Sequence, residues 1–318
     1  MSHKCLSCQI SNCGAALQSG YHPRCSEKLF GTPGPPEIHF STPDIVREAR
    51  RMAGRISVSG VQPKLSVVYN RKKHLLTSIE KGGAYILKPQ TEIFESLPEN
   101  ENLCMRIAYV YGIAIPPHGL IRLADDRLAY LVRRFDRLDD GSKLHQEDFQ
   151  QLLQSNDKYE GSYEKIARFV KKHSATPAHD LVRLYKSALL FFVLGNGDAH
   201  LKNFSLIRSE SGPCHLSPAY DIVSSRLVLP EEKEEMCLSI QGRRNRLSIK
   251  DFVKLSKHFG LRGEQANHAL RRLTELKPVI ESMIRKSFLN QRLKHGFLEI
   301  FRERMRRLQP RPAKNPKT

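Results

Sequence analysis

Residues 195–205 read Gly-Asn-Gly-Asp-Ala-His-Leu-Lys-Asn-Phe-Ser, and they place four residues between Asp198 and Asn203. The apolar run 189–194 leads into this polar stretch, and a strand-like segment follows it. Asp and Asn are common turn and capping residues, so the pair alone also has a purely structural interpretation. Its chemistry depends on which other residues the chain places beside it.

A hairpin is predicted directly after this stretch. Segments 204–208 and 215–220 have strand character and flank a turn rich in Ser and Gly. Folding of the hairpin brings Asp221 close to Asn203. Protein kinases use the same Asp-x4-Asn spacing, with the aspartate accepting a hydroxyl proton and the asparagine holding a metal ion on the phosphates. With Asp221 as a second metal ligand the set predicts phosphoryl transfer, although Asp221 could instead cap a helix.

A second set of residues, upstream, supplies other parts of a nucleotide site. Residues 57–60, Ser-Val-Ser-Gly, form a small polar loop whose N–H groups could approach a phosphate, although alone it suggests an ordinary hairpin. The apolar strand 84–88 ends at Lys88, and Glu101 opens a helix thirteen positions later. A carboxylate on the apolar face of that helix is costly unless it is paired, which makes Lys88 the predicted partner. The alternative is that Glu101 simply favours the dipole of the first helical turn.

In this order the motifs resemble those of the HipA family of bacterial serine/threonine kinases, the toxins of toxin–antitoxin systems. The resemblance implies an α+β, bilobal, protein-kinase-like (HipA-like) fold with a strand-rich N-lobe and a mainly helical C-lobe. The matching stretches are 57–64, 86–89, 100–104, 132–137, 144–148, 195–205 and 219–222.

The resemblance also implies a role for each matching residue. Asp198 is then the catalytic base, and Asn203 and Asp221 hold Mg²⁺. Lys88 contacts the ATP phosphates, with Glu101 as its ion-pair partner. Lys202 is expected to neutralise charge at the γ-phosphate, and His200 to shape the loop by hydrogen bonding. The further expected ATP-binding residues are Ser59, Gly60, Val61, Gln62, Lys64, Val132, Arg133, Phe135 and His200.

Regulation, substrate and partners are implied in the same way. Ser57 and Ser59 fit the autophosphorylated Ser-x-Ser pattern of the shorter HipT branch of three-component HipBST systems, and a phosphate there would take the place of the ATP phosphates. The implied substrate is a serine of an aminoacyl-tRNA synthetase. The implied partners are small HipS-like and HipB-like antitoxins, with DNA contacted only through an antitoxin. Arg133 departs from the acidic hinge residue of many relatives, which leaves the nucleotide preference open.

The net charge of +19 over 318 residues is the most unusual feature of the composition. A basic surface suits a nucleic acid, and it equally suits an acidic protein such as a synthetase or an antitoxin. No apolar run approaches the length of a membrane span, and no apolar signal core follows the first residues. We therefore expect a cytoplasmic protein without membrane contact.

Cysteines gather near the start of the chain. Cys5, Cys8, His22 and Cys25 have the spacing of zinc ligands and could form a closed structural site. The alternative is a set of reduced, unpaired thiols in a flexible terminus, and Cys13 complicates the choice of ligands. The remaining cysteines are expected to be small core residues: Cys104, Cys214 and Cys237.

Four parts are expected along the chain. They are the Cys/His-rich segment 1–31, an N-lobe over 37–134, a catalytic C-lobe over 135–308 and a basic disordered tail over 309–318. Residues 279–308 are expected to form one helix. The predicted activity is that of an ATP-dependent protein serine/threonine kinase acting as a toxin. The alternative is a catalytically weak, basic protein- or DNA-binding module of a toxin–antitoxin complex.

Overall fold

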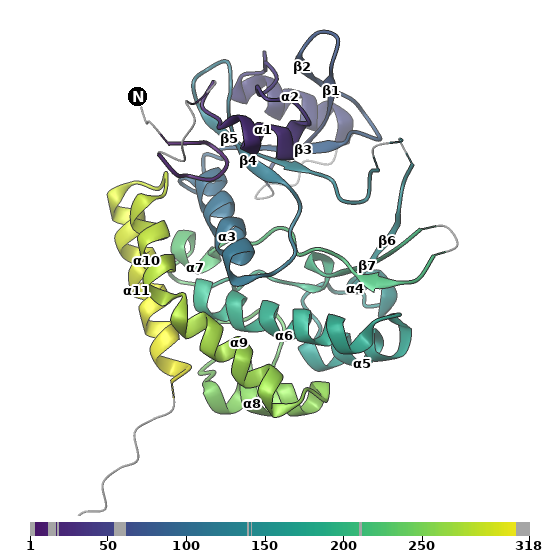
Figure 1. The fold of residues 1–318 in the computed structure, drawn as a ribbon, viewed down its shortest axis with the longest axis vertical. Coiled ribbons are helices and arrows are strands. Elements are labelled where there is room, and N and C mark those ends of the chain that lie inside the picture. Colours follow the sequence, from purple (N-terminus) through teal and green to yellow (C-terminus); the bar gives the residue numbers. More distant parts are fainter. Residues whose placement is uncertain are drawn as a thin grey trace, which may run out of the picture. The chain divides into compact units, whose positions relative to one another are not determined.

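The computed structural model describes residues 4–11, 17, 19–53, 62–138, 140, 142–209 and 212–309. Within them the chain forms two units (Figure 1). The first comprises Met1–Leu144 with Ser282–Lys294, and the second His145–Glu281 with His295–Thr318. The first unit thus takes in both the Cys/His-rich segment and the expected N-lobe. Helices and strands both occur in each unit, as the expected α+β class requires.

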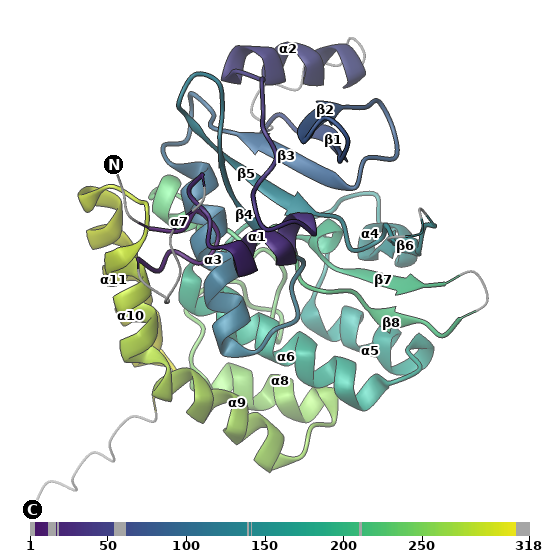
Figure 2. The same ribbon diagram turned by 45° about the horizontal axis from the view of Figure 1, so that its top comes forward.

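A five-stranded antiparallel sheet organises the first unit, in the order β2-β1-β3-β5-β4. Helix α3 packs against β4 and β5, and α2 against β1 and β3; Figure 2 shows these two helices on opposite sides of the sheet. The bounds are α1 Pro23–Phe30, α2 Thr42–Ala53, β1 Leu65–Asn70, β2 Leu75–Ser78, β3 Tyr85–Pro89, α3 Leu97–Tyr111, β4 His118–Arg122 and β5 Leu128–Arg133.

The core of this unit draws on the N-terminal segment as well as on the sheet. Tyr21 and Phe30 are almost completely buried in one cluster with Leu65, Leu87 and Leu131. Burial of large aromatic side chains is a main source of folding free energy. The described residues before α2 therefore share one core with the sheet.

The second unit is built around helix α6, whose apolar C-terminal half is buried. Helices α5, α8 and α9 pack against it (Figure 1). A helix that is apolar on all sides needs such neighbours. The helices are α4 Phe149–Leu152, α5 Tyr163–His173, α6 Pro177–Leu194, the 3₁₀ turn η1 Leu201–Asn203, α7 Ser225–Val228, α8 Ile249–Phe259 and α9 Gly263–Glu275.

The predicted hairpin is present, with a shorter second strand than expected. Strand β7, Ser205–Arg208, pairs antiparallel with β8, His215–Leu216, through Leu206↔Leu216 and Ile207↔His215. The Ser217 N–H still donates to the Ser205 carbonyl at 2.9 Å, and the chain leaves the ladder at Pro218, which lacks a backbone donor. A third strand, β6 His145–Asp148, joins the other edge of β7 and gives the order β6-β7-β8.

The prediction of a single helix over residues 279–308 is wrong. The structure has α10, Lys277–Lys286, and α11, Gln291–Arg307. Asn290 separates them and accepts the N–H of Leu293 on Oδ1 at 2.9 Å, which is a helix N-cap contact. No helix in the described part of the chain is long and apolar enough to cross a membrane.

Candidate active site

The loop that carries Asp198 begins directly after the last residue of α6, at Gly195. Gly195 has φ +67°, a left-handed conformation that glycine adopts most easily. A Cβ there would lie 2.9 Å from a methyl of Ile300 and 3.1 Å from Cβ of Arg226. Side chains of the second unit thus pack closely against the backbone at the start of the loop and fix its position.

A chain of hydrogen bonds holds the next part of the loop. The Gly197 N–H donates to Ser225 Oγ at 2.8 Å, and that hydroxyl donates to Glu232 Oε2 at 2.9 Å. The side chain of Asn196 accepts the N–H of Asp198 at 3.3 Å. These contacts position Asp198 through its own backbone and leave its carboxylate out of the network of the preceding residues.

Asp198 is exposed to solvent, and the surrounding protein still influences its carboxyl group. Partial burial raises its pKa above the ordinary value, the positive charge of Lys158 opposes this, and the negative charge of Asp221 adds to it. A carboxylate with a raised pKa is a stronger base than a free aspartate. The environment is therefore compatible with the expected role in proton transfer.

Asn203 closes the loop onto itself. Its Oδ1 accepts the N–H of His200 at 3.0 Å, and its own N–H donates to the His200 carbonyl at 2.9 Å. One lone pair of Oδ1 is thus used locally. A carbonyl oxygen has a second lone pair, so the residue retains capacity for one further interaction, such as a metal ion.

Asp221 follows β8 in an uncommon backbone conformation, with φ +55°. Non-glycine residues in this region are infrequent and concentrate at functional sites. Its charge contributes to the pKa values of both Asp198 and His200, which places it beside the loop. Tyr220, the preceding residue, donates its hydroxyl to the Lys202 carbonyl at 2.8 Å. The hairpin therefore does return Asp221 to the loop, as the sequence predicts.

His200 contributes to the loop through its backbone. Its N–H donates to Asn203, while Nδ1 of the ring is buried and has no hydrogen-bond partner among the described residues. The ring packs edge-on against Tyr159, with 5.6 Å between centroids. Burial, followed by the charge of Lys158, lowers its pKa to about 4, so the imidazole is neutral near pH 7. Lys202 is exposed.

Two residues beside the Asp198 loop were not predicted from the sequence. Glu232 lies so close that a Cβ on Gly197 would be 2.7 Å from its Oε2; burial raises its pKa, and the charge of Asp198 raises it further. Lys158 acts on Asp198 by its charge and accepts the Leu201 N–H on its carbonyl at 3.0 Å. Both come from irregular segments, and no motif or spacing marks them.

The first unit contains the predicted lysine–glutamate pair. Lys88 Nζ on β3 lies 2.7 Å from Glu101 Oε1 on α3, and both side chains are buried. The ammonium group also lies 5.6 Å from the ring centroid of Tyr130, within the range of a cation–π contact. The Lys88–Glu101 ion pair that helical periodicity predicts is thus present in the fold.

The other expected ATP contacts of this unit fall into two segments. Gln62 donates from Nε2 to the Pro89 carbonyl at 2.9 Å, which ties the end of the phosphate loop to the residue after Lys88. Lys64 is exposed. The expected loop positions Ser57, Ser59, Gly60 and Val61 lie outside the described residues.

The segment expected to meet adenine is the end of β5. Val132 is buried, and Arg133 and Phe135 are half-buried. The Arg133 N–H donates to the Pro117 carbonyl at 2.9 Å, and the Arg134 N–H to the Ala84 carbonyl at 2.8 Å. These two backbone donors are used within the unit, so recognition of a base here would need other atoms.

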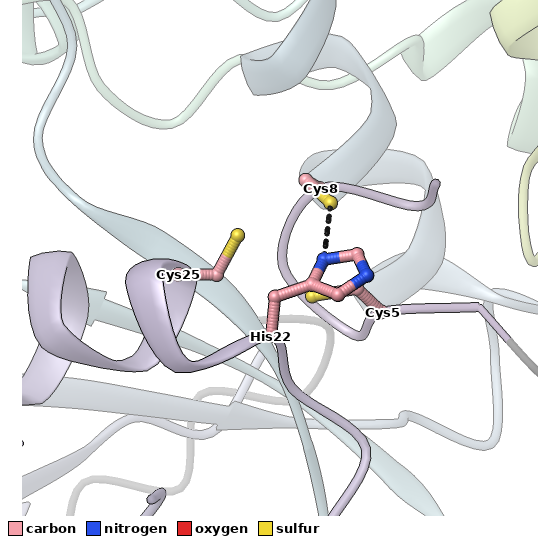
Figure 3. Close-up of side chains that lie close together, drawn as sticks. All are labelled: Cys5, Cys8, His22 and Cys25. Carbon is pink, nitrogen blue, oxygen red and sulfur yellow. Dashed lines mark hydrogen bonds between the residues drawn. The ribbon is translucent and has the colours of Figure 1, made fainter. Parts of the chain in front are cut away.

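The Cys/His cluster is also formed. One ligand atom from each of Cys5, Cys8, His22 and Cys25 lies within 4.8 Å of all the others (Figure 3). Cys8 Sγ and His22 Nδ1 are 3.3 Å apart. Cys13 lies outside the described residues. Of the cysteines expected in the core, Cys104 and Cys237 are buried and Cys214 is half-buried.

Comparison with known families decides the relationship. The profile of the HipA-like C-terminal domain matches residues 56–279. The chain belongs to the HipA-like C-terminal domain family. The matched range contains both Lys88 with Glu101 and the loop of Asp198, whereas the Cys/His cluster precedes it.

Several relatives of this HipA-like domain are named as kinases. A Haemophilus influenzae protein named "Putative kinase" is 28% identical over 315 residues, with 90% of each chain covered. A similarly named protein of Sinorhizobium fredii is 33% identical over 62% of this chain and 48% of its own length. The serine/threonine-protein kinase toxin HipA of Shewanella oneidensis is 29% identical over 54% of this chain and 43% of its own length. The chain thus spans nearly the whole Haemophilus protein and about half of the other two.

Solved structures support the kinase-like fold. HipA of Shewanella oneidensis, in a complex with HipB and operator DNA, aligns with a TM-score of 0.66 at 22% identity, covering 80% of this chain and 64% of its own. The Helicobacter pylori proinflammatory kinase CtkA aligns with a TM-score of 0.52 at 13% identity, covering 72% and 86%. The HipA-like domain therefore has the α+β, kinase-like fold that its motifs predict.

Proposed function

We propose that this HipA-like protein is an ATP-dependent protein serine/threonine kinase that acts as a toxin of a toxin–antitoxin system. The observation that carries the proposal is the buried Lys88–Glu101 pair, 2.7 Å apart, on a strand and a helix. Replacing a buried ion pair by apolar residues is often neutral or stabilising, so the pair is a poor device for stability alone. Kinases need such a pair to place the lysine on the nucleotide phosphates.

The second unit supplies the groups that phosphoryl transfer requires. Asp198 would accept the proton of a substrate serine as its oxygen forms a bond to the γ-phosphorus, and the bond from that phosphorus to the β–γ bridging oxygen breaks to release ADP. Asn203 and Asp221 offer oxygen ligands of the kind that Mg²⁺ prefers. Mg²⁺ bound there would neutralise charge on the phosphates. The exposed Lys202 of the same loop would add a positive charge.

Regulation and partners extend the proposal. We place autophosphorylation at Ser57 and Ser59, as in the HipT branch, and assign the protein a serine of an aminoacyl-tRNA synthetase as its target. The net charge of +19 suits acidic protein partners, including HipS-like and HipB-like antitoxins through which DNA would be reached. The HipB–operator complex of the Shewanella protein supports this assembly. We place the reaction in the cytoplasm.

The proposal is tested by intact-mass spectrometry and peptide mapping before and after incubation with ATP and Mg²⁺. Asp198→Asn removes the base and keeps the shape of the side chain, and Asp126→Asn, an exposed position on a turn, is the matched control. We expect phosphate on Ser57 or Ser59 in the wild type and in the control, but not in Asp198→Asn. Phosphorylation that survives Asp198→Asn would contradict the assigned base. A wild type that gains no phosphate would overturn the proposed autophosphorylation and favour the binding module.

A further inference from the structure

We propose that Cys5, Cys8, His22 and Cys25 form a structural zinc site that fastens the N-terminal segment to the sheet of the first unit. Four ligand atoms within 4.8 Å of one another, from three cysteines and one histidine, match a closed Cys₃His set. In a tetrahedral site with zinc–sulfur bonds of about 2.3 Å, neighbouring ligands are roughly 3.8 Å apart. A small contraction would complete that geometry.

The cluster is built from two turns of the backbone that face each other. In the first, the Gln9 N–H donates to the Cys5 carbonyl at 2.8 Å, which curls the chain so that Cys5 and Cys8 point inward. In the second, His22 caps the start of α1, and the Cys25 N–H donates to its carbonyl at 2.9 Å. Each turn thus contributes one pair of ligands, as Figure 3 shows.

The ligand atoms of the cluster lie inside the fold. Cys5 is completely buried and His22 is 1% exposed. The ring nitrogen of His22 that faces Cys8 is Nδ1, so coordination would use this atom and leave the ring proton on Nε2. Soft thiolates with one imidazole favour zinc over magnesium or calcium.

A disulfide is a weaker explanation of the same arrangement. Three sulfur atoms can form only one bond among themselves, which leaves a third thiol and the imidazole without a role. All three cysteines are free thiols in the structure. A closed metal site uses all four groups.

The position of the cluster gives a bound zinc ion a structural role. The Leu120 N–H donates to the Leu6 carbonyl at 3.0 Å, and Ser7 Oγ donates to the His118 carbonyl at 3.1 Å, so the first turn docks on β4. Gly119, between these two residues of β4, packs closely against the segment, because a Cβ there would lie 3.1 Å from Tyr21 Oη and 3.3 Å from Ser7 Cα. Zinc would hold the turn of Cys5 and Cys8 in the form that docks on this strand, since a segment so short rarely folds alone.

The first test measures metal in the full-length protein, purified without chelators under reducing conditions. Cys8→Ser and Cys25→Ser remove half-buried ligands, and Cys214→Ser, a half-buried cysteine of the second unit, is the matched control. We expect one zinc per chain in the wild type and the control, and zinc binding weaker by at least roughly tenfold in the ligand variants. Equal zinc in all four proteins, or a wild type that takes up none, would overturn the proposal.

A second test uses only the wild type, so it does not depend on whether the variants fold. Iodoacetamide labelling is mapped by peptide mass before and after treatment with a chelator. Zinc at this site predicts that Cys5, Cys8 and Cys25 become labelled much faster once the metal is removed, while Cys214 changes little. Unchanged labelling of the three thiols would overturn the site. Neither test depends on kinase activity, so this proposal and the proposed function can fail separately.

Discussion

The Lys88 ammonium and the Glu101 carboxylate lie 2.7 Å apart in the buried interior of the first unit. Glu101→Gln leaves the lysine without this partner, and Lys88→Met does the same to the glutamate. Breaking a buried pair costs about 3–5 kcal/mol, so each single variant should unfold at lower urea concentration than the wild type.

The double variant Lys88→Met/Glu101→Leu separates stability from function. Because it removes both charges of the pair together, most of the lost free energy of unfolding should return, within about 1–2 kcal/mol of the wild type. Kinase activity should stay absent in all three variants. Full activity in the double variant would show that the pair serves packing alone.

The raised pKa of Asp198 gives two effects of opposite sign. As the base, Asp198 must be ionised, so kcat/KM should fall with decreasing pH through a value above the ordinary aspartate pKa of 3.8. Stability runs the other way, because a folded-state pKa above the unfolded value favours folding at low pH and loses that contribution as pH rises through the folded value.

It follows that Asp198→Asn should be inactive and yet more resistant to urea than the wild type at pH 7, with the difference shrinking towards pH 4. Asp126→Asn should show no such gain. A less stable Asp198→Asn would mean that the carboxylate makes favourable contacts that outweigh its partial burial.

Glu99 on α3 provides a second pH effect, one unrelated to catalysis. Burial raises its pKa to about 7, and its Oε2 is buried without a hydrogen-bond partner among the described residues. Its contribution to stability is therefore complete below about pH 4.5 and is lost as pH rises through about 7. Thermal unfolding of Glu99→Gln should depend less on pH over this window and exceed the wild-type midpoint at pH 8. Parallel wild-type and variant curves would contradict the assignment.

Gly195 should be more sensitive than an otherwise similar glycine. Gly195→Ala and Gly260→Ala both place a side chain in the left-handed region after a helix, which costs about 1–2 kcal/mol. Only Gly195 also has a neighbouring atom within 3 Å of the new Cβ, while the Cβ at Gly260 meets nothing within 4 Å. Urea denaturation should show the larger loss for Gly195→Ala, together with reduced activity. Equal losses of unfolding free energy in the two variants would show that the loop shifts to accommodate the new Cβ at no cost in stability.

Local patterns predicted the parts of the site that lie on regular elements. The pairing of Lys88 with Glu101 follows from the cost of a carboxylate on an apolar helix face, and the return of Asp221 from a hairpin signal. The tie between Gln62 and Pro89 was not predicted, although both positions belonged to matching motifs. The spacing of the motifs along the chain gives their order, but it does not show which of their atoms form hydrogen bonds.

Contacts between segments far apart in the sequence could not be predicted. Glu232 and Lys158 reach the Asp198 loop from segments without periodicity, and β6 joins β7 across more than fifty residues of chain. The break near Asn290 was missed because helical periodicity continues through it and the cap was not recognised. In each case tertiary contact decides what local propensity leaves open.

Transfer of the γ-phosphate by the Asp198 loop can be followed directly with γ-¹⁸O-labelled ATP. The protein is incubated with a dephosphorylated bacterial extract, and heavy phosphate is located by peptide mass. Asp221→Asn is compared with Asp126→Asn, since both aspartates have positive φ, +55° and +61°. We expect heavy phosphoserine with the wild type and Asp126→Asn, and none with Asp221→Asn or Asp198→Asn. Heavy phosphate that persists in both site variants, or that never forms with the wild type, would contradict transfer by this loop.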